Sequence, residues 1–80
     1  MHELGVLNQI VRTVKRVADE NKIKKIKFIT IEVGTESSFV PMFLEKLYPV
    51  AIDKTDLLMG SELKIVMVGG RGLQIKDIGY

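Results

Sequence analysis

The chain has 80 residues, with 12 Lys or Arg against 10 Asp or Glu, a net charge of +2 and no cysteine. This length leaves room for one domain, which we assign to residues 1–80. The lack of cysteine excludes a disulfide scaffold and any zinc or iron–sulfur site with cysteine ligands. No apolar run approaches the roughly 18 residues of a membrane span, and the N-terminus lacks the pattern of a signal peptide, so we expect a cytoplasmic protein.

The first part of the chain predicts a helix and then a strand. Over residues 3–21, apolar side chains recur every three or four positions, which predicts one amphipathic helix: Leu4, Leu7, Ile10, Val11, Val14, Val17 and Ala18. We expect Asn21 to take the left-handed conformation at the helix exit. Residues 26–33 alternate between two faces that are both largely apolar, which predicts an internal strand ended by Gly34.

Residues 40–52 predict a second helix. Pro41 suits its first turn, where the missing N–H is no loss. The spacing of Phe43, Leu44, Leu47 and Val50 predicts the apolar face of this helix. Pro49 removes a backbone hydrogen bond to the carbonyl of Glu45, so we expect a kink or an early end. Residues 53–60 then form a connection with one further helical turn.

Two more strands are predicted at residues 62–68 and 73–78. A two-residue turn between them would set apolar Ile65 opposite polar Gln74, so we prefer a hairpin with the three-residue loop 70–72, in which Met67 faces Ile75. The crossover through the second helix makes strands 26–33 and 62–68 parallel. We therefore predict an α/β (α+β) fold of order α-β-α-β-β, a three-stranded mixed sheet with two helices packed on it.

Residues 12–27 form a basic segment with a net charge of +5. It holds two acidic residues, Asp19 and Glu20, and seven cations: Arg12, Lys15, Arg16, Lys22, Lys24, Lys25 and Lys27. Such a segment suits an acidic partner surface or nucleic acid. The alternative is a solvated helix face that runs into a lysine-rich turn.

The N-terminus carries the only histidine of the chain, in the sequence Met1-His2-Glu3. The α-amine of Met1, the amide nitrogen and imidazole of His2 and the amide of Glu3 can close successive chelate rings around one metal ion. Nitrogen ligands in one plane suit Ni(II) or Cu(II) better than Zn(II), which prefers a tetrahedral site. The first amides of a helix lack intrahelical partners, and the positive end of the helix dipole favours deprotonated amides.

Simpler explanations of these residues stay open. His2 can be a terminal residue without a ligand role. Glu3 can serve only as an acidic side chain in a first helical turn, where the dipole favours it. Because the chain has one histidine, no cysteine and no paired acids at catalytic spacing, it offers no nucleophile–base pair, and we predict that the protein is not an enzyme.

Several short motifs follow one another along the chain. Met1-His2-Glu3-Leu4 opens the first helix, and Ile31-Glu32-Val33-Gly34 closes the first strand. Ser37 and Val40-Pro41 precede the second helix, which carries Tyr48. Gly60-Ser61-Glu62-Leu63-Lys64-Ile65 enters the next strand, and the last strand runs from Gly72 to Ile78. In this order and spacing, over nearly the whole chain, the motifs resemble the HypA-type nickel chaperones of nickel–iron hydrogenase maturation.

The resemblance implies the same order of helices and strands. It also implies nickel bound by His2, with backbone nitrogens from Met1 and Glu3 and the Glu3 side chain as a further ligand. The partners it implies are a maturation GTPase and the hydrogenase large subunit, with a link to urease in some organisms. Family members carry a zinc domain with two CxxC pairs between the last two strands. Residues 69–71 stand at that position here, so we expect no zinc.

Three functional hypotheses follow. The first is a nickel-binding accessory protein, or metallochaperone, with its metal site at Met1, His2 and Glu3. The alternative is a zinc-less interaction module that binds a maturation GTPase or hydrogenase subunit through residues 12–27 without delivering metal. A small RNA-binding protein would rest on the same basic segment alone and is the weakest of the three. A homodimer through the strand edge that ends at Tyr80 is a further expectation, and we expect no membrane partner.

Overall fold

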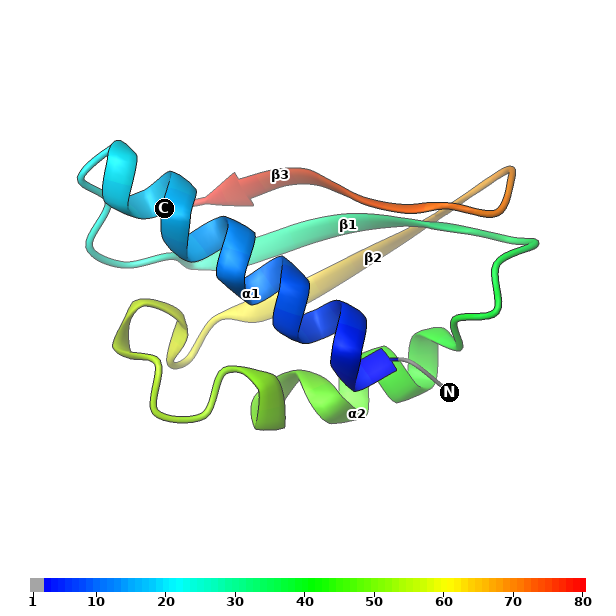
Figure 1. Cartoon of the computed structure of the whole chain (residues 1–80), viewed down its shortest axis with the longest axis horizontal. Coiled ribbons are helices and arrows are strands. Elements are labelled where there is room, and N and C mark those ends of the chain that lie inside the picture. Colours follow the sequence, from blue (N-terminus) through cyan, green and yellow to red (C-terminus); the bar gives the residue numbers. More distant parts are fainter. Residues whose placement is uncertain (1–2) are drawn as a thin grey trace.

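The structure, a computed structural model, describes residues 3–80 as two helices, a short 3-10 helix and three strands. In chain order these are α1 (Glu3–Glu20), β1 (Phe28–Gly34), α2 (Pro41–Ala51), η1 (Asp56–Leu58), β2 (Glu62–Val68) and β3 (Leu73–Gly79). The predicted α+β fold, with two helices and a three-stranded mixed sheet, is therefore confirmed (Figure 1). No helix in the described part of the chain is both long and apolar enough to cross a membrane.

The sheet has the order β2-β1-β3, with β1 parallel to β2 and antiparallel to β3. The prediction that β2 and β3 pair as a hairpin, with Met67 facing Ile75, is wrong. Met67 pairs with Val33 on one side of β1, and Ile75 pairs with Ile31 on the other. The reason is burial: β1 is the most apolar strand, and the central place in the sheet leaves its inward side chains with no exposed surface.

Residues 69–72 carry the chain past the end of β1, from one edge of the sheet to the other. Three hydrogen bonds tie this loop and its flanks to the end of β1 and the next two residues. Gly34 N–H donates to Gly72 O (2.7 Å), Thr35 N–H to Val68 O (2.8 Å) and Glu36 N–H to Gly70 O (2.9 Å). Only glycine fits at position 34, because a Cβ atom there would overlap the Gly70 carbonyl group.

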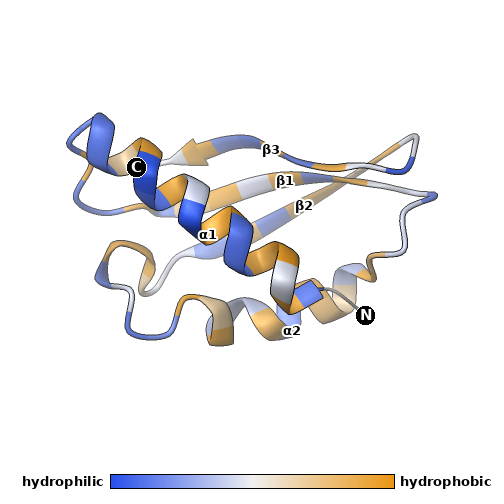
Figure 2. Ribbon diagram, in the orientation of Figure 1, coloured by the Kyte–Doolittle hydropathy of each residue, from blue (hydrophilic) through white to orange (hydrophobic). Residues whose placement is uncertain are grey.

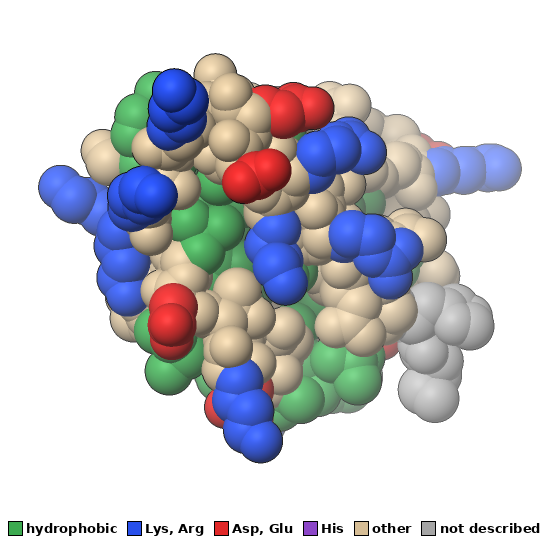
Figure 3. Space-filling model, turned by 60° about the vertical axis from the view of Figure 1, so that its left-hand side comes forward, with side chains coloured by type: hydrophobic (Ala, Val, Ile, Leu, Met, Phe, Trp, Pro, Cys, Tyr) green, Lys and Arg blue, Asp and Glu red, His purple; other side chains and the backbone are tan. Residues whose placement is uncertain are grey.

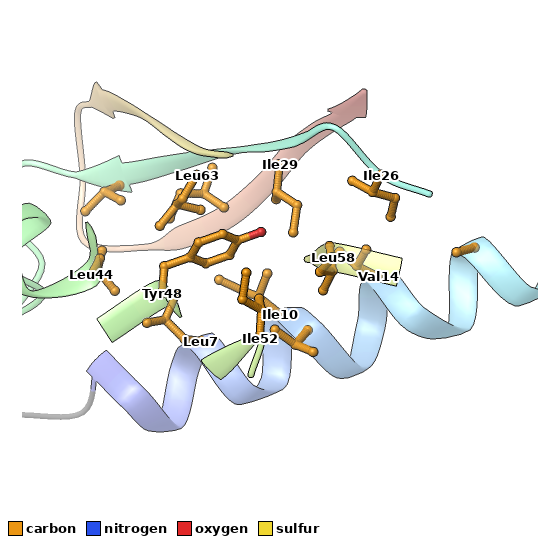
Figure 4. Packing of buried hydrophobic residues seen from close by; sticks show 14 residues of the cluster. Leu7, Ile10, Val14, Ile26, Ile29, Leu44, Tyr48, Ile52, Leu58 and Leu63 are labelled. Atoms are coloured by element: carbon orange, nitrogen blue, oxygen red, sulfur yellow. The ribbon is translucent and has the colours of Figure 1, made fainter. Parts of the chain in front are cut away.

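The hydrophobic core lies between one face of the sheet and the two helices. The inner face of the sheet carries three apolar rows across the strands: Ile29 with Leu63 and Ile78, Ile31 with Ile65 and Ile75, and Val33 with Met67 and Leu73. Leu7, Ile10 and Val14 of α1 and Leu44 and Tyr48 of α2 pack in the same core (Figure 4). The outer face carries polar cross-strand contacts, such as Gln74 Nε2 donating to Glu32 Oε1 at 2.6 Å.

Polar and apolar residues alternate around α1 as the sequence predicted (Figure 2), but two details of the helix differ. Leu4, expected on the buried face, is 39% exposed, whereas Glu3 in the same turn is buried. Lys22 (φ 57°), not Asn21, takes the left-handed conformation at the exit. Asn21 instead caps the helix by donating from Nδ2 to the carbonyl of Val17 at 2.8 Å.

The second helix, predicted over residues 40–52, begins at Pro41 and ends at Ala51, two residues beyond Pro49. The expected apolar face is only partly correct. Phe43 and Val50 are 49% and 59% exposed, whereas Leu44 and Tyr48 are buried. The buried stripe of α2 therefore runs through positions 44 and 48, one turn apart, and leaves part of its apolar surface uncovered.

Candidate metal-binding N-terminus

Of the three predicted metal-site residues, Met1 and His2 lie outside the described residues, and Glu3 is the first residue of α1. The structure therefore shows how the residue that follows His2 is held. The N-terminal ends of α1 and α2 lie at the same end of the molecule (Figure 1). Glu3 is the residue that joins them.

The carboxylate of Glu3 is buried, with only 4% of the residue exposed. Its Oε2 accepts a hydrogen bond from the backbone N–H of Val40 at 3.0 Å. Val40 is the N-cap residue of α2, and its own side chain offers no hydrogen bond to the helix end. The side chain of Glu3 thus fixes the first turn of α1 against the start of α2.

Backbone N–H groups lower the pKa of Glu3. The largest cause is the hydrogen bond from Val40, and the next is one from the amide of Glu3 itself. Both bonds stabilise the ionised form of the carboxyl group. The side chain also lies near the positive ends of two helices, which favour a negative charge. Glu3 therefore carries a carboxylate that favours ionisation, at the position that follows His2 in the sequence.

Sequence reasoning missed the partner of Glu3, because Val40 lies 37 positions further along the chain. A signal for it was present. Val40-Pro41 marks a helix start, and valine cannot supply the side-chain acceptor that such a start needs. Glu3 of α1 supplies an acceptor at this helix start, for the N–H of Val40 itself.

The described residues offer no other metal site. Within 3–80 there is no group of three or more His, Cys, Asp or Glu side chains that could hold a metal ion.

The surface around this end of the molecule is apolar. Exposed apolar side chains here come from the first turn of α1 and the start of α2: Leu4, Val40, Met42 and Phe43. At the other end of α1, every cation of the basic segment is exposed. Exposure alone fits both interpretations of that segment, a solvated face and a contact surface.

Known proteins match this chain over most of its length. A family model described as hydrogenase/urease nickel incorporation, metallochaperone, HypA matches residues 1–78. The hydrogenase maturation factor HypA of Methanocella arvoryzae is 34% identical over 68 residues, covering 85% of this chain and 59% of that protein. The factor of the same name from Trichodesmium erythraeum is 35% identical over 72 residues, covering 90% of this chain and 60% of that protein.

The chain thus spans about three fifths of the length of these two relatives. The solution structure of the nickel metallochaperone HypA from Helicobacter pylori matches with a TM-score of 0.89. This match covers 99% of this chain and 97% of that chain at 12% identity. The likeness to that structure shows a shared fold.

Proposed function

The chain belongs to the HypA family of hydrogenase/urease nickel incorporation metallochaperones, and from this premise we propose that it is a nickel-binding accessory protein for the maturation of nickel–iron hydrogenase. Ni(II) is its cargo and not the cofactor of a reaction, so the protein is not an enzyme. It works in the cytoplasm with a maturation GTPase and delivers nickel to the hydrogenase large subunit. It needs no zinc for nickel uptake.

Met1, His2 and Glu3 hold the nickel in this proposal. The α-amine of Met1 and the amide and imidazole nitrogens of His2 are three of its ligands, and the amide nitrogen of Glu3 is the next. These donors suit Ni(II) in a planar arrangement. The ionised Glu3 carboxylate adds a negative charge beside the bound cation, which strengthens binding.

One observation carries this proposal: Glu3 is buried and anchored to the Val40 N–H immediately after the only histidine of the chain. A chelate made of backbone nitrogens binds more strongly when part of that backbone is already fixed, because less conformational entropy is lost on binding. The anchor holds Glu3, whose amide nitrogen is one of the proposed ligands, at the start of α1.

The test is a calorimetric titration of Ni(II) into protein whose first residue is Met1. We expect one tight site, lost in His2→Ala and weakened when one extra residue precedes Met1, because that residue displaces the amine from the chelate. Glu45→Gln removes an exposed acid on α2 and is the control, which should bind like the original protein. Equal affinity of the original protein and His2→Ala would contradict the proposal.

The second candidate function is an interaction module that binds a maturation GTPase or hydrogenase subunit without delivering metal. This candidate rests on the concentration of positive charge at positions 12–27, where every cation is exposed and available to an acidic partner. Gel filtration of the mixed proteins distinguishes the candidates. A stable complex in the absence of any nickel binding would favour the interaction module over the metallochaperone.

A further inference from the structure

A surface hollow of about 530 Å³ lies where the C-terminal end of α1, the turn after it and η1 meet. Its floor is apolar and is made by Ala18, Ile23 and Leu57. Its rim carries the cations of three side chains, Lys15, Arg16 and Lys24, and a single acid, Asp19. Figure 3 views this end of the molecule, where blue Lys and Arg side chains surround green hydrophobic atoms that reach the surface.

Backbone hydrogen bonds build the α1 side of this hollow. The N–H of Ile23 donates to Ala18 O (2.8 Å) and that of Lys22 to Asp19 O (3.3 Å). Because the backbone of Lys22 has the left-handed conformation, these two bonds form the Schellman motif that ends many helices. The motif brings the residue after the turn beside the last turn of the helix, which sets Ile23 against Ala18.

Two further hydrogen bonds hold η1 against this turn. Lys25 Nζ donates to the carbonyl of Asp56 at 3.0 Å, and the N–H of Ile26 donates to the carbonyl of Leu57 at 2.9 Å. They place Leu57 beside Ile23 on the floor of the hollow. The backbone bond from Ile26, together with the Schellman motif, therefore holds the floor of the hollow in place.

The charge and the floor together indicate one kind of occupant. The basic segment has a net charge of +5 in a chain whose total is +2, so positive potential is concentrated at this end. Residues 12–27 contain no aromatic side chain on which a nucleic-acid base could stack. Aliphatic side chains on the floor suit an aliphatic side chain of a protein partner instead.

We propose that this hollow docks an acidic segment of a partner protein. An aliphatic side chain of that segment packs on Ala18, Ile23 and Leu57, and carboxylates on either side of it pair with Lys15, Arg16 and Lys24. The site begins at Lys15, 12 residues after Glu3, which is about 18 Å along α1 at 1.5 Å per residue. It therefore does not rest on nickel binding, and either proposal can fail without the other.

The test measures the binding of a short fluorescein-labelled peptide of alternating Glu and Leu by fluorescence anisotropy, at low and near-physiological salt. The double variant Arg16→Glu/Lys24→Glu reverses two rim charges and should weaken binding at least about tenfold. The control Lys46→Glu/Lys76→Glu makes the same change in net charge at two exposed lysines outside the hollow and should bind within about twofold of the original protein. Circular dichroism checks that both variants fold.

Two further probes test the chemistry of the occupant without changing the protein. A peptide with Ser in place of every Leu should bind more weakly, because it leaves the apolar floor uncovered. A labelled oligouridylate should bind more weakly than the Glu-Leu peptide near physiological salt. Equal losses in the two double variants, equal affinity for the two peptides, or tighter binding of the RNA would each overturn the proposal.

Discussion

Replacing Gly34 with alanine tests the sheet order β2-β1-β3. A Cβ atom at this position would lie 2.7 Å from the carbonyl carbon of Gly70 and closer still to its oxygen. Both are backbone atoms, so no side-chain rotation relieves the overlap, and the loop 69–72 has to move away from the end of β1. That movement disturbs the three hydrogen bonds from Gly34, Thr35 and Glu36.

A hydrogen bond contributes about 1 kcal/mol net, so Gly34→Ala should lower the free energy of unfolding by about 2–3 kcal/mol. For a domain of this size, that loss lowers the melting temperature by about 10–20 °C. Urea and thermal unfolding followed by circular dichroism measure both quantities. Gly69→Ala is the control, because a Cβ atom there meets nothing within 4 Å, and it should change the stability by less than about 0.5 kcal/mol. Similar stability of the two variants would refute the assigned path of the loop.

Three further predictions concern single residues. Lys22→Gly should stabilise the fold by up to about 1 kcal/mol in urea unfolding, because glycine adopts the left-handed conformation of Lys22 without strain. Tyr48→Phe should cost about 1 kcal/mol in the same assay, because it removes the 2.7 Å hydrogen bond between the hydroxyls of Tyr48 and Ser61; no change would mean that water replaces the bond. Glu3→Gln should make the melting temperature fall less steeply as the pH is lowered below the ordinary glutamate pKa. The pKa of Glu3 is lowered in the fold, so its ionised form stabilises the protein above the ordinary glutamate pKa, and this contribution is lost as the pH falls through the folded pKa. Melting temperatures across that range should converge between the two proteins at low pH; a constant difference would contradict this assignment.

The helices and strands were predictable because each depends on a local pattern. The apolar spacing of residues 3–21 predicted α1, which spans Glu3–Glu20, and the strand predictions were similarly close. The sheet order was not predictable in this way. A glycine-rich loop of a few residues favours pairing of the two strands it joins, but burial of Ile29, Ile31 and Val33 is gained only when β1 separates them. That gain depends on the whole sheet and on no local pattern.

For the candidate metal site, too, the part that depends on local sequence was predictable and the part that depends on the tertiary fold was not. The nitrogen donors of Met1-His2-Glu3 follow one another in the chain, so their chemistry was readable from the sequence. The anchor of Glu3 was not, because it joins two helices through the Val40 N–H. Similarly, the basic character of residues 12–27 was evident from composition, whereas the apolar floor needed Leu57, which only the tertiary fold brings to Ile23.

A nickel titration followed through the backbone amide signals of the ¹⁵N-labelled protein tests nickel binding at the N-terminus. Because the Val40 N–H donates to Glu3, we expect its signal to change together with those of the first residues and to stop changing at one equivalent of Ni(II). Amides beyond the far end of α1, such as that of Lys24, should not respond. Changes centred on other parts of the fold, or an unchanged Val40 signal in excess nickel, would contradict nickel binding at the N-terminus.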